Sequence, residues 1–369
     1  MVTLGRPNYL ELLKLMSRGT RALSARKRSI VLAAGLALAV GLAGCGSSSD
    51  DASNGTTVPG DTTLTLYNAQ HEDLMKVMVD GFTAETGIKV EMRNGDDFEL
   101  ANQIVQEGKA SPADVFVTEN SPAMMLVDNN DDFVEVNADT LAQTPKQFSP
   151  ADNKWVGFAA RSTVLAYNKA QLPEANIPAS IMDLAKPEWK GRIGMAPAGA
   201  DFQAIVSAVV ALKGEPAAEV WLKGLKENAK VYQGNNAVMR AVNAGEIQAG
   251  IIYHYYWYKD QAEAGTNSNN TALHFFTNQD PGAFLSVSGA GVVAASDNKD
   301  AAQKLVKYLN GVSGQQKLAA SDALEYPIGS GVAANAALKP LSELQPPIVD
   351  IATLNGPRVV ELMQEAGLL

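Results

Sequence analysis

Residues 64–118 contain three short apolar runs, Leu64-Thr-Leu-Tyr67, Ile88-Lys-Val-Glu-Met92 and Asp114-Val-Phe-Val-Thr118. Their length and composition are typical of β-strands. The segments between them carry apolar residues at helical spacing, and each ends at a glycine, as helices often do. Strand and helix therefore alternate, and this alternation predicts an α/β fold with mostly parallel strand pairing.

The same alternation continues along the chain, with further strands expected over 247–253 and 284–294. The expected helices span 71–86, 98–107, 203–213, 217–228, 236–243, 301–309 and 314–320. The chain beyond residue 61 is too long for one typical core, which predicts two lobes. Ligands of such folds bind beyond the carboxyl ends of the strands, so polar side chains there are the first functional candidates.

The N-terminal 44 residues have the pattern of a secretory signal peptide, with a basic region followed by an apolar run from Ile30 to Leu42. The ending Leu42-Ala-Gly-Cys45 resembles the lipobox of bacterial lipoproteins, which implies a lipidated Cys45 at the start of the mature chain. A chance cysteine behind an ordinary signal peptide is the alternative. Residues 45–61 are rich in Ser, Gly, Asp, Asn and Thr, the composition of a flexible tether. We therefore expect a domain anchored by lipid to the extracytoplasmic face of the cell membrane.

Charge and cysteine content exclude several classes of function. The chain has 30 Lys and Arg against 40 Asp and Glu, and seven of the former but one of the latter lie in residues 1–44, so the remainder carries about −16. Nucleic-acid binding is not expected without a basic face. Cys45 is the single cysteine, so the domain has neither a disulfide nor a thiol nucleophile. No Gly-x-Ser-x-Gly or His-Glu-x-x-His motif occurs, and we expect a protein that is not an enzyme.

An aromatic run, Tyr253-His-Tyr-Tyr-Trp-Tyr258, follows the strand expected over 247–253. Core packing is one interpretation, since aromatic residues are enriched in strands. The other concerns the adjacent Tyr255 and Tyr256. A phenol, with an ordinary pKa of about 10, becomes an anionic oxygen ligand when a strongly charged cation displaces its proton.

Two further side chains lie just beyond predicted strand ends, His71 after the first strand and Glu119 after the third. Each has a plainer interpretation. His71 could cap a helix or be solvated, and Glu119 could simply precede a helix that begins near Pro122. Glu72 is an alternative carboxylate, although acidic residues are common at helix starts.

Nine motifs between residues 62 and 330 carry a family resemblance. They are Leu66-Tyr-Asn-Ala-Gln-His71, Thr83-Ala-Glu-Thr-Gly-Ile-Lys-Val90, Ser111-Pro-Ala-Asp-Val-Phe116, Trp189-Lys-Gly-Arg-Ile-Gly194, Trp221-Leu-Lys-Gly-Leu-Lys226, Ala241-Val-Asn-Ala-Gly-Glu-Ile247, Asp280-Pro-Gly-Ala283, Ser288-Gly-Ala290 and Glu325-Tyr-Pro327. Together they resemble bacterial ferric ion-binding proteins, the periplasmic components of iron(III) ABC importers. The histidine after Asn-Ala-Gln and the tyrosine pair before Trp257 are the most specific features.

The resemblance implies that His71, Glu119, Tyr255 and Tyr256 bind Fe³⁺. One carboxylate and two phenolates would balance the three charges of the ion, and all three are hard oxygen donors of the kind such an ion prefers. Four protein ligands leave about two octahedral positions for water or a small anion. Neighbouring residues of an extended strand point to opposite faces, so two adjacent tyrosines can reach one ion only from a strand-to-helix turn.

The sequence departs from the family where an accompanying anion binds. The family's Ser-Gly-Ala turn is replaced by Pro197-Ala-Gly-Ala-Asp-Phe202, where Asp201 would repel phosphate. An anion site is implied for the backbone of Gly199 and Ala200 and for the side chains of Asn120, Arg161 and Asn235. Carbonate, phosphate, an organic acid and water remain alternatives. Tyr253 and His254 could add ligands, although buried structural roles are expected of them.

The resemblance also implies an architecture and partners. It implies a two-lobed periplasmic-binding-protein clamshell of type II with mixed sheets and an interlobe cleft. One lobe is expected over 62–160 plus 287–325 and the other over 161–286 plus 326–369. The expected partners are an ABC permease with its ATPase, and the protein itself is expected to be a monomer. A same-fold binding protein for thiamine or a polyamine, and a lipoprotein with a merely structural iron site, are the alternatives.

Overall fold

The computed structural model describes residues 62–354 and 356–369, in which eleven strands form one mixed sheet. The strands are β1 (Thr63–Asn68), β2 (Lys89–Asn94), β3 (Val115–Val117), β4 (Phe133–Val134), β5 (Trp155–Asn168), β6 (Ile193–Met195), β7 (Ala229–Val231), β8 (Ala249–Tyr253), β9 (Thr271–His274), β10 (Leu285–Val293) and β11 (Tyr326–Pro327). The main path runs β2-β1-β3-β10-β5-β8-β6-β7, with β4 beside β10 and with β9 and β11 beside β5.

Helices cover this sheet, and short 3₁₀ turns such as Ile181–Ala185 join several of the elements. The α-helices are α2 (Glu72–Thr86), α3 (Asp97–Glu107), α4 (Ser121–Asp128), α5 (Ala138–Leu141), α6 (Ala200–Lys213), α7 (Glu215–Asn228), α8 (Asn235–Asn243), α9 (His254–Glu263), α10 (Lys299–Asn310), α11 (Val312–Ala320) and α12 (Gly356–Glu365). None of the helices within the described ranges is long and apolar enough to cross a membrane.

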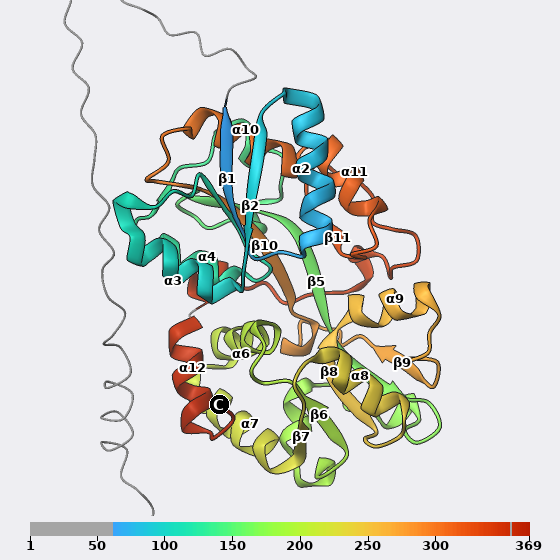
Figure 1. The fold of residues 1–369 in the computed structure, drawn as a ribbon. Coiled ribbons are helices and arrows are strands. Elements are labelled where there is room, and N and C mark those ends of the chain that lie inside the picture. The colour runs from blue at the N-terminus through green and yellow to red at the C-terminus, as the bar shows by residue number, and fades with distance from the viewer. Residues whose placement is uncertain (1–61, 355) are drawn as a thin grey trace, which may run out of the picture. The chain divides into compact units, whose positions relative to one another are not determined.

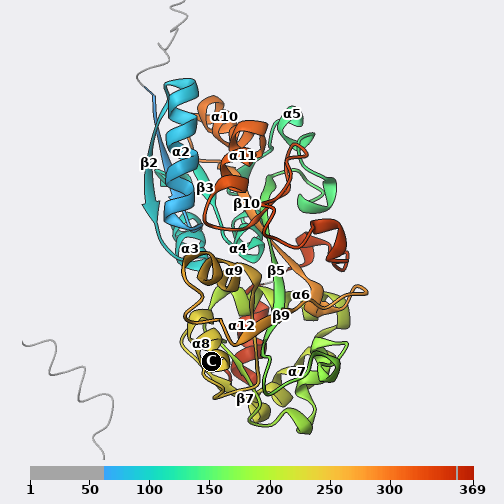
Figure 2. The same cartoon turned by 90° about the vertical axis from the view of Figure 1, so that its right-hand side faces the viewer.

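Strand β5 divides the sheet into two sections. Its residues 155–162 pair with β10, whereas residues 163–168 pair with β8 and β9. The first section comprises β2, β1, β3, β10, β4, β11 and the start of β5, and the second comprises the end of β5 with β6, β7, β8 and β9. Figures 1 and 2 show β5 passing from the first section to the second.

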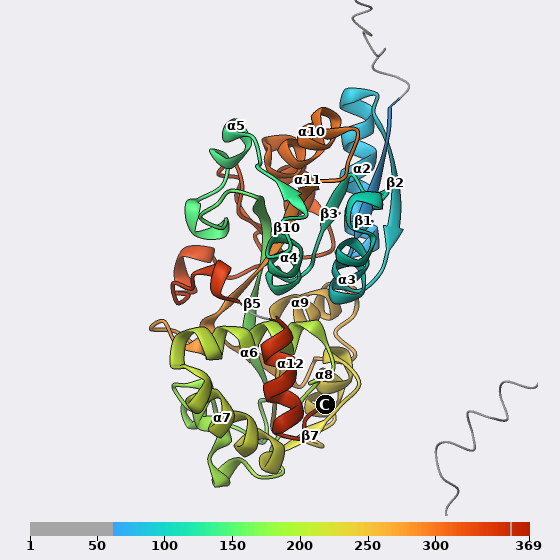
Figure 3. The same cartoon turned by 90° about the vertical axis from the view of Figure 1, so that its left-hand side faces the viewer.

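Each section has its own apolar core. In the first, Leu74, Leu305 and Leu318 of α2, α10 and α11 pack on one face of the strands, and α3 and α4 pack on the other. In the second, α6, α7 and α12 enclose a core that includes Trp221 and Leu362. Figure 3 shows α12 alongside α6, so the end of the chain completes the second core.

The predicted alternation of strands and helices is confirmed, but two features differ from the expectation. The fully buried strand β5 had no predicted counterpart, and β10 pairs antiparallel with both of its main neighbours. The division into lobes at residues 160 and 286 stays a prediction. The signal peptide over 1–44, Cys45 and the tether over 45–61 lie outside the described residues.

Candidate metal centre

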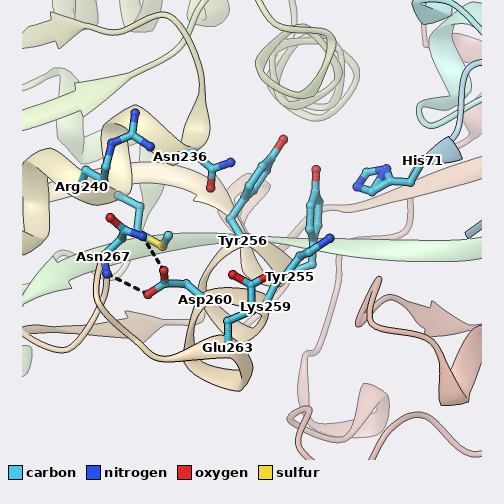
Figure 4. A pocket seen from close by; sticks show the side chains of 10 residues that line it. His71, Asn236, Arg240, Tyr255, Tyr256, Lys259, Asp260, Glu263 and Asn267 are labelled. Atoms are coloured by element: carbon cyan, nitrogen blue, oxygen red, sulfur yellow. Dashed lines mark hydrogen bonds between the residues drawn. The ribbon is translucent and has the colours of Figure 1, made fainter. Parts of the chain in front are cut away.

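His71 lies at the junction of the first strand and the first described helix. It directly precedes α2, three residues after β1 ends. Its backbone N–H donates to Oε1 of Gln70 at 2.7 Å, and its side chain makes no capping hydrogen bond. The imidazole is therefore not used as a helix cap, and it lines a cavity together with Tyr255 (Figure 4).

Glu119 occupies the corresponding position between β3 and α4. Asp97, at the start of α3, accepts hydrogen bonds from the backbone N–H groups of Glu119 at 2.8 Å and Asn120 at 3.0 Å. Burial, and next the negative charge of Glu119, raise the pKa of Asp97 to about 8. The Asp97 carboxyl group thus holds the loop that presents Glu119.

The two tyrosines lie in the first turn of α9, directly after β8. The predicted strand-to-helix turn is thereby confirmed. Their rings stack with centroids 4.1 Å apart and an interplanar angle of 29°, and Figure 4 shows both hydroxyls pointing the same way. Tyr255 is 3% exposed, while Tyr256 is partly exposed. The helical turn therefore brings neighbouring phenols to one side, which an extended strand cannot do.

Contacts between the two sections bring three of the predicted ligands together. The Tyr255 hydroxyl donates to Oε1 of Glu119 at 3.0 Å. Nδ1 of His71 is 3.9 Å from the same carboxylate oxygen, and the His71 ring stands edge-on to that of Tyr255 with centroids 5.0 Å apart. One imidazole nitrogen, one carboxylate oxygen and one phenol oxygen thus converge on a single point.

The fourth predicted ligand, Tyr256, donates to a carboxylate that sequence analysis interpreted differently. Its hydroxyl lies 3.1 Å from Oδ2 of Asp201, in the first turn of α6. Burial, then the charge of Glu119, raise the pKa of Asp201 to about 7. The sequence predicts Asp201 only as a group that repels phosphate, because its place beside Tyr256 depends on a contact between residues 55 positions apart in the chain.

Both phenols are held in their neutral form when no cation is present. Burial and the nearby carboxylates of Glu119 and Asp201 raise the pKa of Tyr255 well above its ordinary value. Burial and the same two carboxylates, Asp201 first, raise the pKa of Tyr256. A trivalent ion among these groups would lower the pKa of both phenols, because it would stabilise every anionic oxygen around it.

Two of the residues predicted to hold an anion donate to Asp201 instead. Nδ2 of Asn235 lies 2.7 Å from Oδ2 of Asp201, and Nδ2 of Asn120 lies 3.3 Å from Oδ1. Gly199 and Ala200 lie at the start of α6, next to Asp201 in the chain. These residues therefore surround a carboxylate that belongs to the protein, and their role toward a free anion stays a prediction.

Arg161, the fifth predicted anion-binding residue, is fully buried in β5. Its Nη1 donates to Oγ of Ser288 at 2.9 Å and to Oε2 of the equally buried Glu325 at 3.1 Å. Its Nε is 3.8 Å from Oε1 of Glu119, while Nε and Nη2 have no hydrogen-bond partner among the described residues. Arg161 thus supplies positive charge and two free donors directly behind Glu119, and Glu325 is a partner that sequence analysis did not identify.

His254 and Tyr253 have the buried contacts of structural residues. The backbone N–H of Ser162 donates to Nδ1 of His254 at 3.1 Å, so Nε2 carries the proton that the carbonyl of Leu324 accepts at 3.0 Å. The Tyr253 hydroxyl donates to the backbone carbonyl of Asp201 at 3.2 Å. Both ring nitrogens of His254 are therefore occupied by backbone groups and are not free for a metal ion.

The environment of His254 predicts a loss of stability in acid. Burial lowers its pKa to about 3, so the unfolded chain takes up the proton first as the pH falls below about 6.5. This contribution to the free energy of unfolding is complete above pH 6.5 and decreases by about 1.4 kcal/mol per pH unit toward pH 3. Urea unfolding of wild type and His254→Gln between pH 7 and 4 should show a shallower decrease in the variant. Equal slopes would contradict the assignment.

A cavity of about 320 Å³ opens beside these ligands and is lined by His71, Tyr255 and Tyr256. Across residues 62–354 and 356–369, no three His, Cys, Asp or Glu side chains gather closely enough to hold a metal ion by themselves. A site here therefore depends on the phenols. Two phenols and two carboxylates supply hard oxygens, and one imidazole supplies a nitrogen, a donor set that suits a small trivalent ion.

Comparisons with known proteins agree with this chemistry. Residues 110–350 match the family model described as bacterial extracellular solute-binding protein. A relative from Serratia marcescens, named Fe(3+)-binding periplasmic protein, is 57% identical over 309 residues, which is 84% of this chain and 91% of that protein.

Two solved structures have the same fold. Iron-bound HitA from Pseudomonas aeruginosa matches with a TM-score of 0.79 and 40% identity, over 83% of this chain and all of that chain. A Trichodesmium protein in complex with iron and citrate matches with a TM-score of 0.73 and 26% identity, over 83% of this chain and all of that one.

Proposed function

This chain belongs to the bacterial extracellular solute-binding proteins, among their ferric-iron-binding members, and we propose that it binds Fe³⁺ through His71, Glu119, Tyr255 and Tyr256. The two-lobed, type II periplasmic-binding-protein fold is common to the chain and its structural relatives. Its function is to capture ferric iron outside the cytoplasm and supply it to an ABC transporter. It acts in transport and has no catalytic role.

One observation carries the assignment of the ligands. Two adjacent, stacked tyrosines donate hydrogen bonds to carboxylates. The Tyr255 hydroxyl donates to Glu119, and the Tyr256 hydroxyl donates to Asp201. When both phenols lose their protons, they and Glu119 carry the three negative charges that neutralise Fe³⁺. The hydrogen bonds keep the oxygens close together before the ion arrives, which reduces the ordering required on binding.

The ligands come from both sections of the sheet, and this links binding to closure. His71 and Glu119 belong to the first section, whereas the tyrosines belong to the second. A conformation that separates the sections would break the ligand set, so the ion favours the closed form. We propose that a permease with its ATPase recognises this form. We also propose that a lipid on Cys45 and the 45–61 tether keep the protein, as a monomer, near the membrane.

Asp201 lies where the family resemblance implied an accompanying anion. Its Oδ2 accepts from Asn235 and from Tyr256, so the carboxylate is already within reach of the ion's surroundings. We infer that Asp201 occupies the position of a small inorganic anion such as phosphate. The citrate in the Trichodesmium neighbour supports an organic acid as a further companion of the ion.

Replacing Asp201 with Asn should make iron binding depend on added phosphate. The substitution removes the negative charge that excludes phosphate, and it frees the amides of Asn120 and Asn235 to donate to an anion. In phosphate-free and carbonate-free buffer we expect the affinity for Fe³⁺ to fall about 10- to 100-fold, and phosphate should restore much of it. Titration of the visible absorption band measures this. Asp300→Asn, an exposed acid in the first turn of α10, is the control. Equal phosphate dependence in both variants would refute the role of Asp201.

Titrations with each solute show whether the protein binds ferric iron or one of the alternative solutes, thiamine or a polyamine. Tyrosinate coordinated to Fe³⁺ absorbs visible light by charge transfer, so iron should colour the purified protein until one equivalent is bound. Thiamine and spermidine should neither bind in calorimetry nor reduce the colour. A colourless protein that binds either organic solute tightly would overturn the proposed function.

A further inference from the structure

The two predicted ligands of the first section, His71 and Glu119, are joined to one group of buried polar side chains. This group, called the buried network below, comprises Gln70, Arg161, Ser288 and Glu325. Gln70 is 4% exposed and the other three are fully buried. The four residues come from distant parts of the chain, and none of them lines the cavity beside the ligands. The network therefore lies behind the site, where it is shielded from solvent.

Gln70 holds the backbone of His71. Its Oε1 accepts the backbone N–H of His71 at 2.7 Å. Its Nε2 donates to Oγ of Ser288 at 2.7 Å and to Oε2 of Glu325 at 3.2 Å. With the side-chain amide turned over, two donors would face each other at His71 and two acceptors at Glu325, so only one orientation satisfies these contacts. The position of His71 is thus fixed by an amide that is itself fixed.

Ser288 holds the backbone of Glu119 in a similar way. Its hydroxyl oxygen accepts from Nε2 of Gln70 and from Nη1 of Arg161, at 2.7 Å and 2.9 Å. Both of these groups are donors only, so the single hydroxyl proton is left for the backbone carbonyl of Glu119, 3.3 Å away. Asp97 accepts the N–H of Glu119 at 2.8 Å. Both backbone polar groups of this ligand are therefore held.

The strand that carries Ser288 has an irregularity at this point. The pairing of β10 with β5 shifts register between Ser288 and Gly289. Such bulges re-aim side chains and are common beside functional sites. The irregularity therefore lies at the residue whose hydroxyl contacts Glu119, Gln70 and Arg161 together.

We propose that Gln70 and Ser288 are positioning residues for Fe³⁺ binding, which hold His71 and Glu119 as one unit. The inference rests on the function proposed above. Each residue acts through the backbone of the ligand that it contacts, and the bond between Nε2 and Oγ joins the two. Without these contacts, both ligands would have to be ordered when the ion binds, at a cost in affinity.

Gln70→Met and Ser288→Ala test the proposal. Each variant removes hydrogen bonds with little change of side-chain shape. Each should weaken Fe³⁺ binding about 10- to 100-fold, as loss of a group that orients a metal ligand typically does. The visible tyrosinate band should persist at saturating iron, because both phenols remain. Competition with EDTA, followed through this band, measures the affinity.

The matched controls are Gln315→Met and Ser296→Ala, the same changes at buried residues away from the ligands. Gln315 is fully buried in α11 and donates to the backbone carbonyls of Phe158 and Leu309. Ser296, 3% exposed, donates to the carboxylate of Asp114. In urea unfolding these variants should lose stability as the test variants do, yet they should bind iron with wild-type affinity. The comparison separates positioning from a general loss of stability.

Combination with ligand variants shows whether each residue acts through its ligand. In His71→Ala protein, Gln70→Met should cause a smaller further loss of affinity than in wild type, and Ser288→Ala should do so in Glu119→Ala protein. Wild-type affinity in both Gln70→Met and Ser288→Ala, or undiminished losses in the ligand variants, would overturn the positioning role. Wild-type affinity in His71→Ala and Glu119→Ala would instead overturn the proposed iron ligands, so the two failures can be told apart.

Discussion

Tyr255→Phe/Tyr256→Phe should abolish the visible colour of the iron-loaded protein and reduce its affinity for Fe³⁺ by more than about 10⁴-fold. We expect so large a loss because removing a group that merely hydrogen-bonds a metal ligand already lowers metal affinity about 10- to 100-fold. The double variant loses two of the three negative charges that balance the ion, and phenylalanine retains the stacked rings. The colour should vanish because no phenolate remains to donate charge. Absorption spectra during ferric titration measure both effects.

The control for this prediction is Tyr258→Phe, the same change two residues further along α9. Tyr258 does not line the cavity, and its ring contacts those of His254 and Trp257. It should keep the band and the affinity of wild type. Each single variant, Tyr255→Phe or Tyr256→Phe, should bind iron more weakly and with an altered band. A double variant that keeps an unchanged band would refute the assignment of the phenols.

Arg161→Met should destabilise the iron-free protein by roughly 3–5 kcal/mol, because it leaves a carboxylate buried without its counter-charge. Glu325 is completely buried, and without Arg161 its Oε2 would keep only the side-chain amide of Gln70, at 3.2 Å, as a hydrogen-bond partner among the described residues. Its Oε1 already has no partner among the described residues. Urea unfolding at pH 7, monitored by circular dichroism, measures the loss of free energy of unfolding.

Two further variants separate charge from packing in this prediction. Arg161→Met/Glu325→Leu removes both charges and should recover most of the lost stability, since apolar replacements of buried ion pairs are often neutral. Lys76→Met breaks an exposed pair with Asp80 and should cost less than about 1 kcal/mol. A near wild-type stability for Arg161→Met, or no recovery in the double variant, would contradict the role of the pair.

The tyrosine turn could be predicted from sequence because the constraint was local. Adjacent residues of a strand face opposite ways, so two tyrosines at one ion require a change of backbone direction. The structure ends β8 at Tyr253 and begins α9 at His254. The predicted bounds of the first and third strands placed His71 and Glu119 just beyond strand ends, and the structure brings both within contact of Tyr255 or of each other.

Strand β5 could not be predicted in the same way. All fourteen of its residues are buried, so it lacks the alternation of polar and apolar residues by which half-buried strands are found. It also contains Arg161, Ser162 and Thr163, three polar residues that sequence alone does not assign to a buried strand. Arg161 pairs with Glu325, 164 residues away, and Asp201 meets Tyr256 at a separation of 55. Such partners follow from the tertiary fold and leave no local pattern.

The position of β10 has a consequence for the order in which the chain folds. In the first section β10 lies between β3 and β5, so the early strands reach the rest of the sheet only through a strand that spans residues 285–293. A growing chain therefore cannot finish its N-terminal core until more than three quarters of its length has been made. Long-range pairing of this kind slows folding and leaves strand edges unpaired meanwhile. The strands that wait for β10 are β3, β4 and β5, and β5 also carries the buried charge of Arg161.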